Sequence, residues 1–140
     1  MEHGALRLRS QYPGASVLVV EDDDDGREAL ARILSFAGYV VASCSNGVEA
    51  LNYLKSSRRP PDVILLDLMM PVMDGCAFRD EQRKDASFSE IPVVIVSAQG
   101  DLKHTVDGDA YLDKPLEFRS LVETIDRMVL PPHTPTATAS

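Results

Sequence analysis

Polar residues that could do chemistry together stand directly after apolar stretches of the sequence: Glu21, Asp22, Asp67, Ser97 and Lys114. Three carboxylates at one edge of a sheet would repel one another unless a cation lay among them. Mg²⁺ suits such a place, because it is bound by one or two carboxylates together with water and phosphate oxygens. A carboxylate can also be a nucleophile that forms an aspartyl phosphate. Since a metal and a lysine neutralise charge in phosphoryl transfer, we predict Asp67 as the phosphoacceptor beside a Mg²⁺ site.

The elements that must position these residues are short apolar runs alternating with amphipathic stretches. The predicted strands are Val17–Val20, Tyr39–Ala42, Val63–Leu66, Val93–Val96 and Tyr111–Leu112. The predicted helices are 29–37 with Gly38 as its cap, 48–54, one beginning near Asp74 or Gly75, and 118–129. Strict alternation predicts an α/β fold, a doubly wound five-stranded parallel sheet with helices on both faces. The functional site of such folds lies at the carboxyl ends of the strands.

Four segments of the chain resemble one known family. They are Leu18–Asp22, Asp62–Gly75, Val94–Ala98 and Tyr111–Pro115, in this order and each at the end of a predicted strand. Together they are similar to the receiver domains of response regulators, over about Val17 to Val129. The resemblance implies a flavodoxin-like sheet with strand order 2-1-3-4-5. It also implies a single-domain signalling protein of a bacterial two-component system, with Mg²⁺ as its cofactor.

The resemblance implies roles for the acidic residues and for the loop after the third strand. Asp67 would be the phosphoacceptor, and Asp22 would bind Mg²⁺ directly, as Asp67 also would. Glu21 would hold a metal-bound water, and the backbone carbonyl of Met69 would be the third protein ligand. Met69 and Gln99 occupy the positions whose side chains tune the rate of dephosphorylation in this family.

The resemblance also implies roles for the residues that end the fourth and fifth strands. Ser97 would contact the phosphoryl group once it has formed, and Tyr111 would be the aromatic that swings inward with it. Lys114 would pair with the acceptor carboxylate and then with the phosphate. Pro115 would follow a cis peptide bond.

The chain departs from the family pattern between the fourth and fifth strands. Ser97 and Lys114 lie 17 positions apart, a few fewer than in typical receivers. The missing residues fall where the family has its fourth helix, so we expect residues 100–108 to form one or two turns at most. The fourth helix should therefore be shortened, and with it part of the surface that most receivers use for dimerisation or for targets.

Ordinary structural explanations compete with some of these roles. Asp23, Asp24 and Asp25 are best explained as a solvated run that caps a helix N-terminus. The run also mimics a calcium-binding loop, but its twelfth position is Arg32, where that loop needs a glutamate. Taken alone, Ser97 and Lys114 would be structural or surface residues and Tyr111 a core residue; only the whole constellation favours the functional assignment.

Composition limits the classes of partner and compartment. The net charge of −8 and the scattered lysines and arginines argue against a nucleic-acid surface. Two cysteines, no signal peptide and no apolar run long enough for a spanning helix predict a cytoplasmic protein without a membrane partner. We expect an N-terminal extension over 1–16, the receiver domain over 17–130 and a disordered tail over 131–140.

Three functions follow from these observations and are kept open. On the first, a histidine kinase or phosphotransfer protein donates the phosphoryl group. The domain then catalyses only its own phosphorylation and dephosphorylation, and its output is contact with a downstream protein. The second is a receiver-like scaffold that works without phosphorylation. The third is a phosphohydrolase with an aspartate nucleophile, which is disfavoured because Met69 stands where its second aspartate is required.

Overall fold

A sheet of five parallel strands organises the protein, in a computed structural model that describes residues 9–68, 75–98 and 106–129. The strands are β1 (Ser16–Val20), β2 (Val40–Cys44), β3 (Val63–Asp67), β4 (Val93–Ser97) and β5 (Ala110–Asp113). Their order is β2-β1-β3-β4-β5, and each neighbouring pair is parallel. The doubly wound fold class and the order 2-1-3-4-5 are confirmed.

Alternate residues of each central strand face opposite sides of the sheet, as the two-residue period of a strand requires. In β1, Leu18 and Val20 belong to one buried cluster, while Val17 and Val19 belong to another. β3 and β4 are buried at every position. Strands that are apolar on both faces need a helical layer on each side, which is why this sequence forms three layers.

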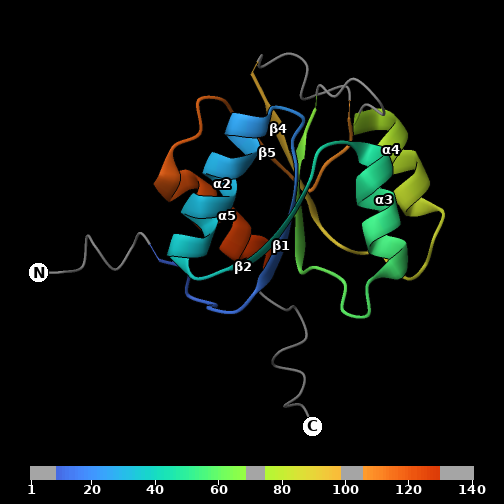
Figure 1. Cartoon of the computed structure of the whole chain (residues 1–140), viewed down its shortest axis with the longest axis horizontal. Helices are drawn as coiled ribbons and strands as arrows, with labels where there is room; N and C mark the ends of the chain where they lie inside the picture. Colours follow the sequence, from blue (N-terminus) through green and yellow to red (C-terminus); the bar gives the residue numbers. More distant parts are fainter. Residues whose placement is uncertain (1–8, 69–74, 99–105, 130–140) are drawn as a thin grey trace, which may run out of the picture.

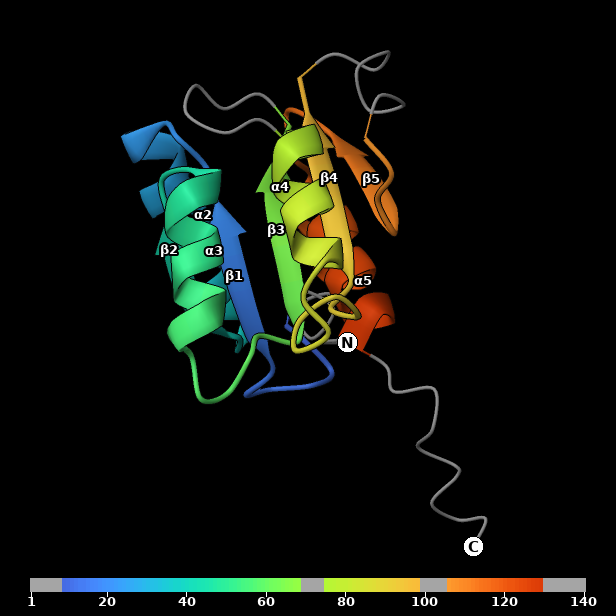
Figure 2. The ribbon, with the colours of Figure 1, turned by 90° about the vertical axis from the view of Figure 1, so that its right-hand side faces the viewer.

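Four helices within the described residues supply these two outer layers, with the labels of Figure 1. They are α2 (Asp24–Ala37), α3 (Gly47–Ser56), α4 (Gly75–Arg83) and α5 (Phe118–Val129). Figures 1 and 2 show α2 and α5 on one face of the sheet and α3 and α4 on the other. The helix predicted over 118–129 is found with the same bounds.

The cap at the end of α2 determines where the next strand begins. Gly38 has a φ of 110°, and its N–H donates to the carbonyls of Leu34 and Ser35. The N–H of Tyr39 donates to the same Leu34 carbonyl at 3.1 Å, which makes a Schellman cap. The predicted cap at Gly38 is confirmed. Because Tyr39 completes that cap, β2 begins at Val40, one residue later than predicted.

The segment before β1 lies against the two helices of one layer. β1 begins at Ser16, the last residue of the predicted N-terminal extension. The N–H of Ser10 donates to the Ala37 carbonyl at 2.8 Å, and the N–H of Gln11 donates to Asp126 at 2.9 Å. Residues 10 and 11 are therefore attached to the ends of α2 and α5.

Two expectations fall wholly or partly outside the described residues. The shortened fourth helix was expected at 100–108; residues 99–105 are not described, and residues 106–109 contain no helix. The predicted disordered tail, 131–140, is also outside the described part of the chain. Among the residues that are described, no helix combines the length and apolarity needed to cross a membrane.

Candidate functional site

The carboxyl ends of neighbouring strands bring the polar side chains to one edge of the sheet. Asp67 is the last residue of β3, and Ser97 is the last residue of β4. Val20 and Leu66 are register partners in β1 and β3, and Glu21 and Asp67 are the next residues along these strands. Parallel pairing alone therefore makes the acidic ends of β1 and β3 neighbours.

Three carboxylates form a cluster at this edge. One oxygen each from Glu21, Asp22 and Asp67 lies within 4.8 Å of the others. Glu21 and Asp67 are buried, whereas Asp22 is exposed. Buried carboxylates so close together need positive charge beside them. A donor set made of carboxylate oxygens suits a hard divalent cation, so the residues present fit a magnesium site.

Lys114 reaches into the acidic cluster from the loop after β5. Its Nζ lies 3.2 Å from Oε1 of Glu21 and 3.7 Å from Oδ1 of Asp67. Partial burial opposes the charge on this ammonium, but the carboxylates of Asp67 and Glu21 outweigh it and raise the pKa of Lys114. The lysine therefore offsets one of the three negative charges. The peptide bond between Lys114 and Pro115 is cis, as predicted.

Arg27, which no sequence pattern singled out, fixes the turn that carries Glu21 and Asp22. Its Nη1 donates to the backbone carbonyl of Glu21 at 3.0 Å and to that of Asp22 at 3.4 Å. Its Nη2 donates to Asp24 at 2.6 Å. An arginine in the first turns of a helix carries no signal that it points back to the preceding loop, so only the structure shows this contact.

Ser97 is fully buried where β4 meets β5. Its backbone carbonyl accepts a hydrogen bond from the Lys114 N–H at 2.8 Å, and its register partner in β5 is Asp113. Ser97 therefore stands on the strand next to Asp67 and is joined through the backbone to the site lysine. The predicted residues Glu21, Asp22, Asp67, Ser97 and Lys114 all come together at the carboxyl edge of the sheet.

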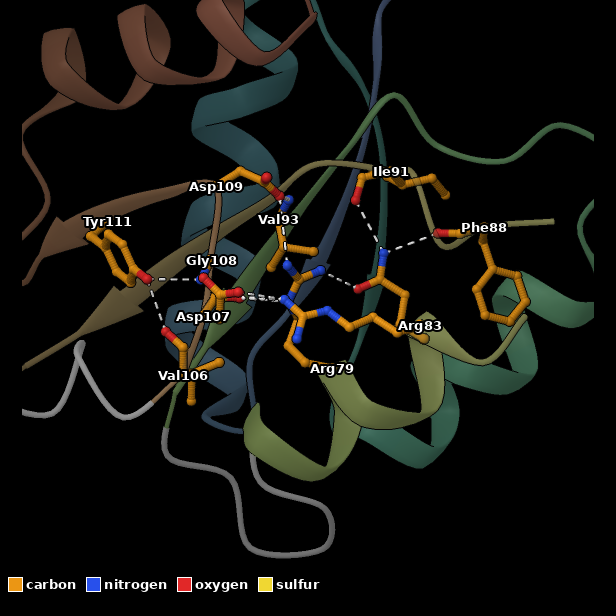
Figure 3. Close-up of polar contacts among 11 residues, drawn as sticks. Arg79, Arg83, Phe88, Ile91, Val93, Val106, Asp107, Gly108, Asp109 and Tyr111 are labelled. Atoms are coloured by element: carbon orange, nitrogen blue, oxygen red, sulfur yellow. Dashed lines mark hydrogen bonds and ion pairs between the residues drawn. The ribbon is translucent and has the colours of Figure 1, made fainter. Parts of the chain in front are cut away.

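Tyr111 is hydrogen-bonded to the connection between β4 and β5. Its hydroxyl donates to the Val106 carbonyl at 3.0 Å and accepts from the Gly108 N–H at 2.8 Å (Figure 3). The ring is partly buried and packs against the core cluster that contains Val106. In this conformation Tyr111 holds the described part of the β4–β5 connection, residues 106–109.

A buried polar network ties α4 to the same connection (Figure 3). Nε of Arg79 donates to the Asp107 carbonyl at 2.8 Å, and Nη1 donates to Oε1 of Gln82 at 2.7 Å. Nε2 of Gln82 donates to the carbonyls of Phe88 and Ile91 at 3.0 and 3.1 Å. Arg79 and Gln82 are both buried, and each buried group has a partner. Neither residue was predicted to take part in the site.

The remaining predicted residues are Asp23, which caps a helix, and Met69 and Gln99, which are not among the described residues. Asp23 is the N-cap of α2, and its carboxylate accepts from the Gly26 N–H at 2.7 Å, which confirms helix capping for this acidic run. Met69, predicted as a ligand and as a rate-tuning residue, lies outside the described residues, and so does Gln99.

Known proteins share this sequence and this arrangement. Residues 17–126 match the family described as the response regulator receiver domain. Response regulator MprA of Mycobacterium ulcerans (strain Agy99) is 38% identical over 111 residues, which cover 76% of this chain and 46% of that protein. The chain thus spans less than half the length of the curated relatives it matches first.

Two solved structures show the same fold. The receiver domain of sensor histidine kinase PA1611 from Pseudomonas aeruginosa PAO1 superposes with a TM-score of 0.75 and 27% identity, covering 83% of this chain and 98% of that one. That structure has a magnesium ion coordinated in its active site cleft. Chemotaxis protein CheY4 of Vibrio cholerae gives a TM-score of 0.73 and 29% identity, covering 82% of this chain and 98% of that one.

Proposed function

Because the chain belongs to the response regulator receiver domain family of two-component signalling, we propose that it accepts a phosphoryl group on Asp67. The donor is a histidine kinase or a phosphotransfer protein. The observation that carries this proposal is the buried Asp67 carboxylate, which lies within 4.8 Å of two other carboxylates and 3.7 Å from the Lys114 ammonium. A carboxylate nucleophile in these surroundings is held in place. The Lys114 ammonium and a bound cation can compensate the negative charge around it.

The acidic cluster holds Mg²⁺ in this proposal. Asp22, Asp67 and the backbone carbonyl of Met69 would be the protein ligands, and Glu21 would hold a metal-bound water. The ion supplies neutralisation of the charge on the transferred phosphoryl oxygens. Support comes from the oxygen-only donor set of this chain and from the magnesium ion in the similar PA1611 receiver domain.

The chemical step exchanges one bond to phosphorus for another. A carboxylate oxygen of Asp67 attacks the phosphorus atom of a phosphohistidine, and a P–O bond forms as the P–N bond breaks. The imidazole nitrogen of the donor leaves with the bonding electron pair. Lys114 holds the Asp67 carboxylate before the step and the phosphoryl oxygens after it, and Ser97 donates its hydroxyl to one of those oxygens.

The phosphorylated domain acts through a population shift and not by turnover of an external substrate. Contacts of Ser97 and Lys114 with the phosphoryl group favour a second arrangement of the neighbouring loops, in which Tyr111 moves inward. Met69 and Gln99 set the rate of hydrolysis. Residues 17–130 form this receiver unit in the cytoplasm, and its output is contact with another protein, since the net charge of −8 disfavours nucleic acid.

The test is intact-mass spectrometry after incubation with a small acyl phosphate and Mg²⁺. We expect one phosphoryl group on the natural chain, none without Mg²⁺ and none on Asp67→Asn. Asp80→Asn is the matched control, because it makes the same change at an exposed position of α4 and should be phosphorylated normally. A folded natural chain that stays unmodified with fresh donor would refute the proposal and favour the phosphorylation-independent scaffold.

A further inference from the structure

Arg27 stands in the first turn of α2, directly after the residues that carry the acidic cluster. Its N–H donates to the Asp23 carbonyl at 2.8 Å, within the turn that the N-cap Asp23 begins. Because side chains on a helix lean toward its N-terminus, a long side chain at this position can lie back over the loop that precedes α2. The Arg27 side chain is only 21% exposed, so protein covers most of it.

The guanidinium of Arg27 contacts the main chain of the acidic pair. Its Nη1 donates to the backbone carbonyls of Glu21 at 3.0 Å and Asp22 at 3.4 Å, and its Nη2 donates to the Asp24 carboxylate at 2.6 Å. A planar guanidinium presents its donors in a fixed fork and can hold several acceptors in one geometry. Lys114, in contrast, approaches a carboxylate oxygen of Glu21 at 3.2 Å. The lysine therefore offsets charge in the cluster, whereas the arginine holds the backbone that carries it.

The residue that most depends on this support is Asp22. Glu21 is tied to the sheet, because its N–H donates to the Cys44 carbonyl of β2 at 3.1 Å. Asp23 is tied to α2 as its N-cap. Asp22 lies between these two anchors with an exposed side chain, and its carbonyl accepts from Arg27. The exposed carboxylate of Asp22 is thus carried by a peptide unit that Arg27 holds.

We propose that Arg27 is a positioning residue that gives the acidic cluster a preference for Mg²⁺ over Ca²⁺; this rests on the magnesium site proposed above and goes beyond it. Mg²⁺ requires near-ideal octahedral geometry, whereas Ca²⁺ accepts more oxygen ligands in a flexible arrangement. A turn that is held in one conformation favours the ion with the stricter geometry. Loss of the Arg27 contacts should therefore weaken the binding of Mg²⁺ more than that of Ca²⁺.

The test is calorimetric titration of the full chain with MgCl₂ and, separately, with CaCl₂. We expect Arg27→Met to bind Mg²⁺ about tenfold more weakly, as other residues that orient metal ligands do when they are removed, and Ca²⁺ within about threefold of the natural chain. Charge alone predicts the opposite sign, because removing a positive charge near a cation site should tighten the binding of both ions. Arg27→Lys keeps the charge but not the fork, so its affinity for Mg²⁺ should lie between those of the natural chain and Arg27→Met.

A matched control and a metal-free measurement separate positioning from a general loss of structure. Arg32 also lies on α2, but its side chain is 78% exposed in an ion pair with Glu28, so Arg32→Met should bind both ions as the natural chain does. In the metal-free state, the amides of Glu21 and Asp23 should exchange faster with solvent in Arg27→Met than in Arg32→Met. The amides of β3 and β4 should exchange equally in both variants, because the sheet stays folded.

The proposal is overturned if Arg27→Met binds Mg²⁺ as tightly as the natural chain or more tightly. It is also overturned if this variant loses the same factor for Mg²⁺ and Ca²⁺, and, should the variant not fold, if Arg27→Lys keeps the natural ratio of the two affinities. These results leave the proposed function standing, because they concern the variants alone. A natural chain that binds no Mg²⁺ would instead overturn the proposed magnesium site together with the role of Arg27.

Discussion

At the scale of single residues, Lys114 competes with any cation for the acidic cluster. Its Nζ is 3.2 Å from a Glu21 oxygen and 3.7 Å from an Asp67 oxygen. We expect Lys114→Met to bind Mg²⁺ about tenfold more tightly, because a positive charge a few ångströms from the ion opposes binding by about 1.4 kcal/mol. The same variant should be phosphorylated more slowly. Isothermal titration with MgCl₂ measures the affinity, and intact-mass time courses measure the phosphorylation rate.

The control for this prediction changes the net charge equally at a distant place. Lys84 follows α4, and its side chain is 69% exposed in an ion pair with Glu81. Lys84→Met should leave the affinity for Mg²⁺ within about twofold of the natural chain, since this charge is exposed, screened by salt and already paired with Glu81. Equal tightening by both variants would mean that overall charge, and not the position of Lys114, controls metal binding.

The two cysteines should make different contributions to stability at alkaline pH. Burial raises the pKa of the Cys44 thiol from near 9 to about 11, with Glu49 adding to the effect, whereas Cys76 is exposed. Above pH 9 the thiol ionises in the unfolded chain but stays protonated in the folded chain. Its contribution to the free energy of unfolding is therefore fully present below pH 9 and is lost as the pH rises to about 11. Between pH 9 and about 11, the free energy of unfolding should fall less in Cys44→Ala than in the natural chain. We expect the difference between the two falls to be about 1 to 2 kcal/mol.

Urea unfolding at several pH values checks this prediction, and the slopes matter more than the absolute stabilities. Cys44→Ala will be less stable at neutral pH because it leaves a small cavity. Cys76→Ala should keep the slope of the natural chain, since Cys76 is exposed and its surroundings change little when the chain unfolds. A Cys44→Ala slope equal to that of the natural chain would contradict the assignment.

At the scale of elements, Arg79 braces α4 against the connection between β4 and β5. Its side chain is 8% exposed, and it satisfies the carbonyl of Asp107 and the amide oxygen of Gln82. Arg79→Met removes both donors and leaves these groups poorly paired. We expect a loss of about 2 to 4 kcal/mol in the free energy of unfolding, together with faster amide exchange at Gly108. Urea unfolding and hydrogen exchange measure the two effects.

Arg83 provides the matched control one turn away on the same helix. Its Nη2 lies 2.8 Å from Oδ2 of Asp107, but the two side chains are 45% and 77% exposed. An exposed ion pair contributes about 1 kcal/mol or less, so Arg83→Met should be nearly neutral. Similar losses in the Arg79 and Arg83 variants would show that the buried network of Figure 3 does not brace the loop.

Most helices and strands could be predicted from the sequence, because the apolar pattern of each fits either a strand or a helix and not both. β3 and β4 are continuous aliphatic runs, and the stripe of α5 repeats at helical spacing, so their bounds came out within a residue. β2 was harder, because Val40 is 60% exposed and the edge strand has no complete apolar run. Its true start depends on the hydrogen bond from Tyr39 into the end of α2, which no local pattern indicates.

The candidate site was predictable to the extent that it depends on strand ends. Asp67 and Ser97 terminate buried strands, so topology alone brings them to one edge. Contacts made by long side chains were not predictable. Arg27 folds back to the loop before its helix, and Arg79 reaches a segment 28 residues further along the chain. Such contacts depend on rotamers and on tertiary packing, which residue types and spacing do not record.

At the scale of the whole molecule, the acidic cluster and the end of α2 lie at opposite ends of the sheet. The acidic cluster lies at the carboxyl ends of β1 and β3, whereas Ser10 is bound to Ala37, which ends α2 just before β2 begins. Substitutions at distant sites without shared partners have nearly additive effects on stability. We expect Ser10→Ala, which removes the hydroxyl that donates to Asp126, to leave the affinity for Mg²⁺, measured by calorimetric titration, unchanged within error. A changed affinity would show that the two ends communicate.

Magnesium should stabilise the whole fold, and Asp22 should decide by how much. Without the ion, Asp22, Glu21 and Asp67 repel one another, so Asp22→Asn should raise the free energy of unfolding in a chelating buffer. Mg²⁺ at ten times its dissociation constant should stabilise the natural chain by about 1.4 kcal/mol, because it binds the folded state. Asp22→Asn should lose most of that gain, whereas Asp80→Asn, at an exposed position of α4, should keep it. Thermal unfolding with and without Mg²⁺ measures this stabilisation in all three chains. If Mg²⁺ stabilised Asp22→Asn as much as the natural chain, Asp22 would not be a ligand of the ion.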